Sequence, residues 1–169
     1  MKRFVIPLII LMLVGIQNSL FENIRILGVK PDIALTFVIC YTFVRGNPEG
    51  TVAGILCGLF EDIFFAGAFG INSIGCMITT YLIGSMEGNL YKDNIFIPGI
   101  FTFIGSILKE CIVMLMLYLT RNNIVLYSAL TKIIIPEAIY NTIIVVLFFK
   151  FAAKISSRYY IMKPGNFIS

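Results

Sequence analysis

The stretch Gly50–Asn72 reads GTVAGILCGLFEDIFFAGAFGIN and combines an apolar helix pattern with regular glycines and two adjacent carboxylates. The glycines recur at every fourth position: Gly50, Gly54 and Gly58. Residues four apart lie on one side of a helix, so the glycines form a stripe that continues to Asp62, while Glu61 lies beside it. Glycine admits a neighbouring backbone, and close packing drives helix association in lipid. The stretch predicts a membrane helix whose small-residue seam faces either another helix of this chain or a partner.

The composition indicates an integral membrane protein. Of the 169 residues, 59% are hydrophobic and only 13% are charged, whereas soluble domains have about 25% charged residues. The basic residues lie in short loops and in the C-terminal tail, without the basic face that nucleic-acid binding requires. We therefore expect contact with membrane lipid and no nucleic-acid partner.

Six apolar segments predict an all-α bundle of six transmembrane helices, forming a single membrane domain over residues 1–169. The expected spans are 4–21, 31–44, 49–65, 71–86, 95–119 and 133–153. A spanning helix needs about 20 apolar residues, so the second segment is short and the fourth is marginal. The first segment resembles a signal peptide, but it is long and no A-x-A cleavage site follows, which favours an uncleaved span.

The distribution of basic residues predicts the orientation of these spans. With six crossings, both termini lie on one side together with most of the loop and tail cations: Lys2, Arg3, Arg45, Lys92, Lys150, Lys154, Arg158 and Lys163. The opposite side holds fewer: Arg25, Lys30, Arg121 and Lys132. Because cytoplasmic loops carry the excess of Lys and Arg, both termini are expected in the cytoplasm of a bacterial cell.

Lys109 is an ionisable residue within an expected span. It lies 14 residues after Ile95, and Asp62 lies 13 residues after Glu49, so two helices that run in the same direction bring both to one depth in the outer leaflet. An unpaired charge inside a membrane is costly, and a paired one much less so. We therefore predict an ion pair between Lys109 and either Asp62 or Glu61.

Further polar residues reach a similar depth and predict a buried polar cluster in the outer half of the bundle. Its expected members are Asp32, Glu61, Asp62, Lys109, Glu110 and Glu137. Gln17 and Asn141 lie near the same level. Such a cluster either forms a functional site or holds the helices together, and the sequence leaves both possibilities open.

The sequence gives little support for catalysis, a cofactor or a metal site. It has no histidine, no G-x-S-x-G motif and no P-loop. The four cysteines, which lie in apolar segments without a C-x-x-C spacing, are expected to be buried apolar residues. Glu61 and Asp62 point about 100° apart on a helix, so they would not flank one substrate. We expect a protein that is not an enzyme.

Two motifs resemble the rod shape-determining protein MreD family. They are KPDIALTFVICYTFVRG, which opens with proline and aspartate, and PEGTVAGILCGLFEDIFFAGAFGINSIG, which has the spacing G-x-x-x-G-x-x-x-D. The positions that match the family motif are Pro31, Asp32, Gly54, Gly58, Asp62 and Gly70. The chain length and the nearly loop-free layout of six segments fit that family too. Glu61, Lys109 and Glu110 are not assigned by the family pattern.

The resemblance implies a scaffold subunit of the bacterial cell-elongation complex, which links peptidoglycan synthesis enzymes to the shape-determining apparatus. The implied partners are an MreC-like bitopic membrane protein, a peptidoglycan glycosyltransferase and a penicillin-binding protein. The implied fold is similar to the membrane substrate-binding subunits of energy-coupling-factor transporters. Such a vitamin-binding subunit is the alternative function, although the chain lacks tryptophan to stack on a ring-bearing vitamin. A small channel is a third possibility, but few polar residues lie in the inner half.

Overall fold

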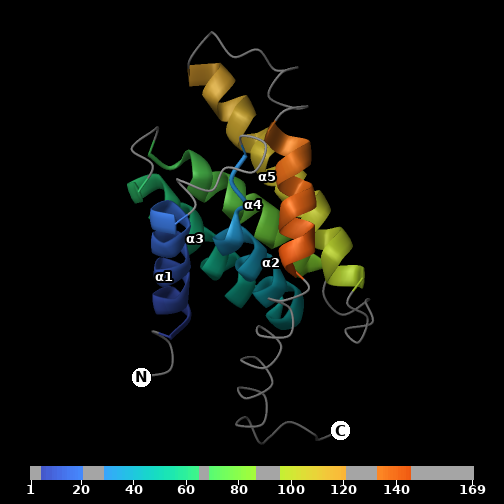
Figure 1. Cartoon of the computed structure of the whole chain (residues 1–169). Coiled ribbons are helices and arrows are strands. Elements are labelled where there is room, and N and C mark those ends of the chain that lie inside the picture. Colours follow the sequence, from blue (N-terminus) through green and yellow to red (C-terminus); the bar gives the residue numbers. More distant parts are fainter. Residues whose placement is uncertain (1–4, 21–28, 65–68, 87–95, 121–132, 146–169) are drawn as a thin grey trace, which may run out of the picture.

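The computed structural model describes residues 5–20, 29–64, 69–86, 96–120 and 133–145 (Figure 1). These residues form helices and no strand. The labelled helices are α1 (Val5–Leu20), α2 (Ile33–Arg45), α3 (Glu49–Phe64), α4 (Ile71–Ser85) and α5 (Phe96–Thr120). A further helix, Ile135–Val145, is drawn in orange beside α2 and α5 in Figure 1. The helix ends lie within two residues of the expected boundaries wherever these are described, and residues 146–153 of the expected sixth span lie outside the described residues.

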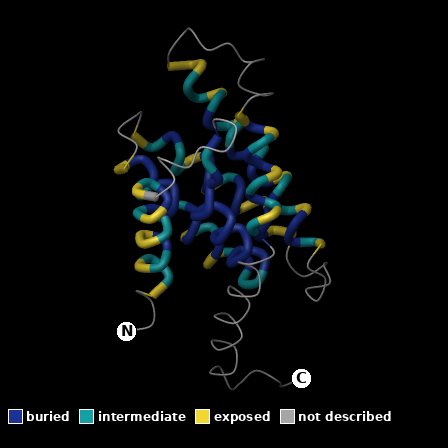
Figure 2. Tube along the Cα trace, in the orientation of Figure 1, coloured by how far each residue is buried: buried dark blue, intermediate teal, exposed yellow. Residues whose placement is uncertain are grey.

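Helix α2 is the central helix of the bundle. Every residue from Ile33 to Phe43 is buried, and the tube through the middle of Figure 2 is correspondingly dark blue. A helix that is apolar on all sides is stable only when neighbours cover all of it. The short second segment is thus a buried core helix, and its 13 residues are fewer than the about 20 of a typical spanning helix.

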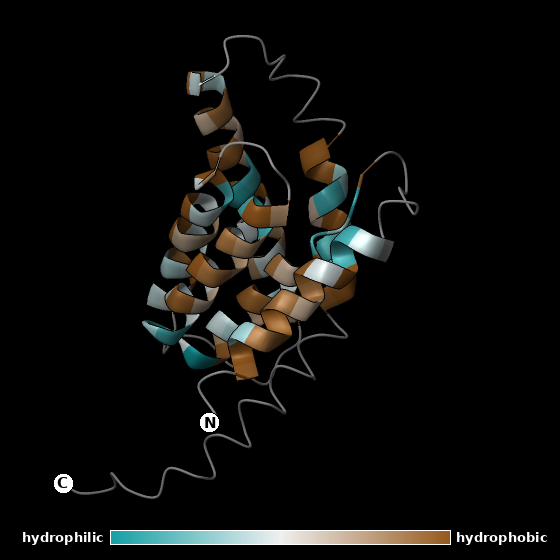
Figure 3. Ribbon diagram, turned by 90° about the vertical axis from the view of Figure 1, so that its left-hand side faces the viewer, coloured by the Kyte–Doolittle hydropathy of each residue, from teal (hydrophilic) through white to brown (hydrophobic). Residues whose placement is uncertain are grey.

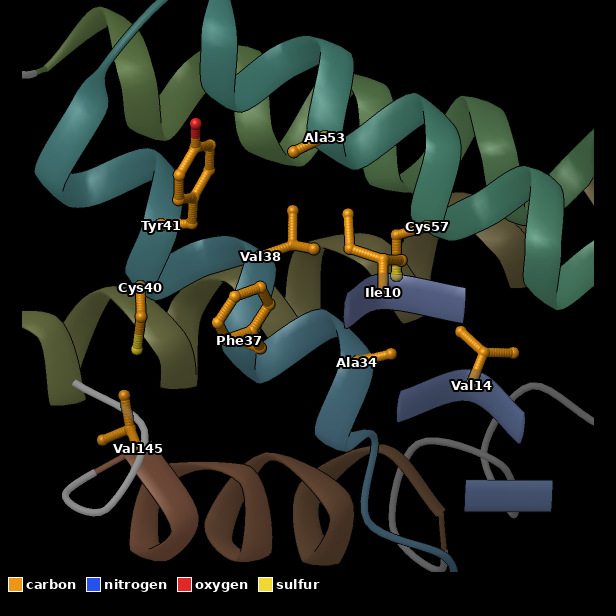
Figure 4. Packing of buried hydrophobic residues seen from close by; sticks show 10 residues of the cluster. All are labelled: Ile10, Val14, Ala34, Phe37, Val38, Cys40, Tyr41, Ala53, Cys57 and Val145. Carbon is orange, nitrogen blue, oxygen red and sulfur yellow. The ribbon is translucent and has the colours of Figure 1, made fainter. Parts of the chain in front are cut away.

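Two groups of apolar side chains hold α2 in place. On one side Phe37 and Val38 pack with Ile10 of α1 and Cys57 of α3, and Val145 of the last helix joins the same cluster (Figure 4). On the other side Leu35 and Ile39 pack with residues of α4 and α5. The bundle therefore has its other helices arranged around α2.

Many large apolar residues of the described helices are exposed on the outside of the bundle, and much of the ribbon in Figure 3 has the brown colour of hydrophobic residues. On α5, the exposed residues recur at helical spacing: Phe96, Ile100, Ile104, Leu115 and Leu119. Helix α1 exposes Leu8 and Met12 in the same way. Water would not solvate such faces favourably, whereas lipid would.

Among the described helices, α5 is long and apolar enough to cross a membrane. Its 25 residues exceed the about 20 that a crossing requires, while the other helices have 16 residues or fewer. The expected all-helical architecture is present, and the expected number of crossings beyond α5 stays a prediction.

Candidate functional site: a buried charge cluster beside a cavity

Lys109 of α5 lies at the centre of a buried charge cluster. Its ammonium nitrogen is 2.9 Å from Oδ2 of Asp32, 3.3 Å from Oε2 of Glu61 and 3.1 Å from Oε1 of Glu110. The Lys109 side chain is only 6% exposed. Three carboxylates from α3, α5 and the segment before α2 thus surround one cation, which offsets the cost of removing these charges from water.

Asp32 connects this cluster to the start of α2. Its Oδ1 accepts a hydrogen bond from the backbone N–H of Leu35 at 2.9 Å, the usual role of an N-cap aspartate, while Oδ2 binds Lys109. Pro31 precedes it with the fixed backbone angle that suits the entry to a helix. One carboxylate therefore both begins the central helix and attaches it to α5.

Neighbouring helices satisfy two more backbone N–H groups at this end of α2. The side-chain oxygen of Asn141 accepts from Asp32 N–H at 2.8 Å, and that of Gln17 accepts from Ala34 N–H at 3.1 Å. The Asn141 amide also donates to Ser106 Oγ at 2.9 Å. The first turn of a helix has no internal acceptors for its backbone N–H groups, so side chains of α1 and of the last helix supply the acceptors here.

Of the two alternatives expected for the ion pair of Lys109, the structure has Glu61, and Asp62 forms no ion pair with Lys109. Its carboxylate instead accepts hydrogen bonds from the backbone N–H groups of Gly70 at 2.9 Å, Asn72 at 3.1 Å and Ser73 at 3.1 Å. Adjacent residues of a helix point about 100° apart. Glu61 therefore faces α5, while Asp62 faces the N-terminus of α4, whose dipole favours a negative charge.

The glycine stripe of α3 packs against helices of the same chain. A methyl group at Gly50 would collide with the Thr42 side chain of α2, and one at Gly54 would lie 2.9 Å from the Cys76 carbonyl oxygen of α4. At Gly58 it would lie 2.5 Å from the backbone nitrogen of Ser73. The seam is intramolecular at all three positions.

Gly70 precedes α4 with a φ angle of 96°. Residues with a Cβ rarely adopt this left-handed conformation, whereas glycine adopts it without steric cost. The turn presents the Gly70 N–H to Asp62. Two of the motif positions, Asp62 and Gly70, thus form one capping arrangement at the start of α4.

A cavity of about 370 Å³ adjoins the charge cluster. Its lining residues are Gln17, Val29, Lys30, Asp32, Glu61, Asn72, Lys109, Glu110, Ile133 and Glu137. The volume lies within the range of about 300 to 1,000 Å³ that is typical of small-molecule pockets. The structure therefore brings five of the six residues of the expected polar cluster to one cavity, and it directs Asp62 elsewhere.

Glu137 differs from the other acidic residues of this cavity. It is only 7% exposed, yet within the described part of the chain its carboxylate has no hydrogen-bond or ion-pair partner. Burying a charged group without a partner is unfavourable. Glu137 is thus the lining residue whose carboxylate has room for a partner from outside the described residues.

Cys57, Cys76 and Glu61 form a second group near the cluster, which sequence reasoning missed. Their ligand atoms lie within 4.8 Å of one another, close enough to hold a metal ion. However, the ammonium of Lys109 lies 3.3 Å from the same Glu61 carboxylate and repels a further cation there. The i,i+4 spacing of Cys57 and Glu61 on α3 was the available sequence signal.

Comparison with known proteins then identifies the family. The model of the rod shape-determining protein MreD family matches residues 1–155. The chain belongs to the MreD family. No curated protein and no solved structure matches it. The resemblance seen in the sequence is thereby confirmed, whereas the expected similarity to energy-coupling-factor transporter subunits, and the vitamin-binding alternative with it, has no support.

Membership of the MreD family implies a role in determining rod shape, and it makes this chain a membrane-associated structural protein. The positions that resemble the family motif lie in the part of the bundle that the contacts above describe. Asp32 begins α2, Gly54 and Gly58 allow α3 and α4 to approach, and Asp62 with Gly70 begins α4. Lys109 and Glu61 add a charge cluster to that framework.

Proposed function

We propose that this MreD-family chain is a non-catalytic membrane scaffold of the bacterial cell-elongation complex. In this role it links peptidoglycan synthesis enzymes to the shape-determining apparatus. The observation that carries the proposal is the family match over residues 1–155, which covers all of the described helices. Association with an MreC-like bitopic protein, a peptidoglycan glycosyltransferase and a penicillin-binding protein is part of the proposal.

The apolar outer faces support a position within the bilayer. Exposed apolar residues on α1 and α5, such as Met12 at 61% and Leu119 at 69% exposed, suit contact with lipid or with a partner's membrane helix. We infer six crossings in the cytoplasmic membrane with both termini in the cytoplasm, as the distribution of basic residues favours. Reporter fusions at residues 30, 45 and 169 test this arrangement, because a reporter active only outside the cytoplasm should be active at residue 30 alone.

The internal organisation supports a scaffold rather than a catalyst. Lys109, Asp32 and Glu61 are engaged with one another and with helix ends, and these contacts hold helices together. A rigid bundle of this kind suits a protein whose task is to present its outer faces to partners.

Depletion in the bacterium that carries this chain tests the function. Rod-shaped cells should become rounded when the chain is depleted, and a second copy should restore their shape. Co-purification in mild detergent should recover the MreC-like protein together with the tagged chain. Retention of rod shape after complete depletion would refute the proposed role, whereas normal depletion rounding without co-purification would refute only the direct contact with that partner.

A further inference from the structure

We propose that the cavity beside Lys109 binds an ammonium group from outside the chain, and that Glu137 is the residue that receives it. This inference does not depend on the role in cell elongation. It rests on the charge balance of the cavity, on the unpartnered Glu137 carboxylate, on the cavity's volume and on the way in which the chain already binds an ammonium group of its own.

The charge balance favours a cation. Four carboxylates line the cavity, from Asp32, Glu61, Glu110 and Glu137, against the two ammonium groups of Lys30 and Lys109. The Lys109 ammonium is already shared among three of these carboxylates at 2.9 to 3.3 Å. Glu137 is therefore the lining carboxyl group that has no cation at ion-pair distance among the described residues.

Glu137 supplies the observation that points to a ligand. It is only 7% exposed, it lines the cavity, and its carboxylate has no hydrogen-bond or ion-pair partner among the described residues. A bound ammonium would donate charge-assisted hydrogen bonds to this carboxylate. It would also reduce the repulsion between Glu137 and Glu110, both of which face the same cavity.

The volume favours an organic ammonium over a bare metal ion. The cavity has a volume of about 370 Å³. One water molecule occupies about 30 Å³ in the liquid, so the cavity is many times larger than one water molecule. A dehydrated metal ion would fill little of this space. A headgroup-sized or amino-acid-sized molecule would fill it and could place its nitrogen beside Glu137.

Lys109 shows that this part of the bundle accommodates an ammonium group. Its nitrogen lies 2.9 to 3.3 Å from carboxylate oxygens of three different chain segments, and it donates a charge-assisted hydrogen bond to Asp32 at 2.9 Å. The cavity extends this environment towards the surface, since Ile133, another lining residue, is 46% exposed. The carboxylates of Asp32, Glu61 and Glu110 already pair with Lys109, which leaves Glu137 to receive the ligand.

Titration calorimetry on the full-length chain tests the proposal. The chain is reconstituted in phosphatidylcholine nanodiscs, and ethanolamine, choline and magnesium chloride are titrated separately. Ethanolamine should bind saturably, choline should bind more weakly because its nitrogen has no N–H donor, and Mg²⁺ should not bind at the same site. Glu137→Gln keeps the side-chain volume but removes the charge, and it should weaken ethanolamine binding tenfold or more.

Two further variants keep the test decisive. Glu49→Gln is the matched control, because Glu49 lies at the opposite end of α3 from Glu61 and contacts Arg45, so ethanolamine affinity should be unchanged. Glu110→Gln provides a second cavity variant if Glu137→Gln fails to fold, and it should also weaken binding. Three outcomes would each overturn the proposal. Ethanolamine could fail to bind saturably, the cavity variants could bind it as tightly as the unmodified chain, or Mg²⁺ could bind at a site that depends on Glu137.

Two sources could supply the ammonium group, a soluble amine or the headgroup of an amine-bearing phospholipid. Including phosphatidylethanolamine in the nanodiscs distinguishes them. A rise in the apparent Kd for ethanolamine in these nanodiscs would identify the headgroup as the ligand. An unchanged Kd would identify a soluble amine.

Discussion

The ammonium nitrogen of Lys109 lies 2.9 Å from Oδ2 of Asp32, although the two residues are 77 positions apart in the sequence. Their side chains are only 6% and 5% exposed. Because Asp32 also begins α2, this contact fixes the central helix of the bundle to α5.

Replacement of Lys109 by methionine should strongly destabilise the bundle. The change keeps the length of the side chain but leaves the carboxylates of Asp32, Glu61 and Glu110 close together without a cation. Removing one partner of a buried ion pair costs about 3–5 kcal/mol. Thermal unfolding in detergent should show a large decrease in midpoint, and the amount of chain in the membrane should fall.

Adding Glu61→Gln to the Lys109→Met variant provides the control. The double variant has one carboxylate fewer in the unpaired cluster, so it should be more stable than Lys109→Met alone. Equal or lower stability of the double variant would mean that the cluster does not act through charge pairing.

Asp62 should stabilise the bundle through its hydrogen bonds to the start of α4 rather than through an ion pair with Lys109. Asp62→Ala removes the acceptor for the N–H groups of Gly70, Asn72 and Ser73, and the loss of such a helix cap should cost about 2 kcal/mol. Asp62→Asn retains one side-chain oxygen and should cost less. Chemical denaturation of the two variants, side by side with the unmodified chain, measures this order. Identical losses would argue against capping as the role of Asp62.

The helix ends could be predicted from the sequence because local signals set them. Pro31 and Asp32 precede α2, Gly70 precedes α4, and the apolar runs between such residues correspond to helices. That Lys109 and Glu61 lie at one level of the bundle could also be predicted, since the rise per residue of a helix is fixed. Both predictions depend on one helix at a time.

The pairing of charges could not be predicted in the same way. Glu61 and Asp62 share a depth, and the choice between them depends on how α3 is rotated about its axis, which packing against α4 and α5 determines. The cavity and the lack of a partner for Glu137 depend on side chains from several helices at once. The burial of α2 could not be predicted either, because it depends on which helices surround α2. Its 13 residues alone indicate only a short apolar segment.

Gly58 should tolerate no side chain, because α4 approaches α3 at this point. In Gly58→Ala the new methyl group would lie 2.5 Å from Ser73 N and 2.6 Å from the carbonyl carbon of Asn72, both backbone atoms that cannot move aside independently. Overpacking of this kind costs about 1–3 kcal/mol, and we expect the upper end of that range. Gly15→Ala is the matched control in α1, where a methyl group would meet no atom within 4 Å. Size-exclusion profiles and unfolding midpoints should show a clear loss for Gly58→Ala and none for Gly15→Ala, and similar behaviour of the two would contradict the close approach of α3 and α4.

Asn141 should be the main polar attachment of the last described helix to the bundle. It is fully buried, accepts from Asp32 N–H at 2.8 Å and donates to Ser106 Oγ at 2.9 Å. Asn141→Leu has a similar volume but leaves both partners unsatisfied, and each buried unsatisfied group costs about 1–3 kcal/mol. Ser106→Ala removes one of these two bonds and leaves the bond to Asp32, so it should cost less. Limited proteolysis measures the attachment directly, because Asn141→Leu should expose the helix Ile135–Val145 to cleavage sooner than Ser106→Ala does. If both variants resist the protease as well as the unmodified chain, apolar contacts such as that of Val145 with the core suffice to hold this helix.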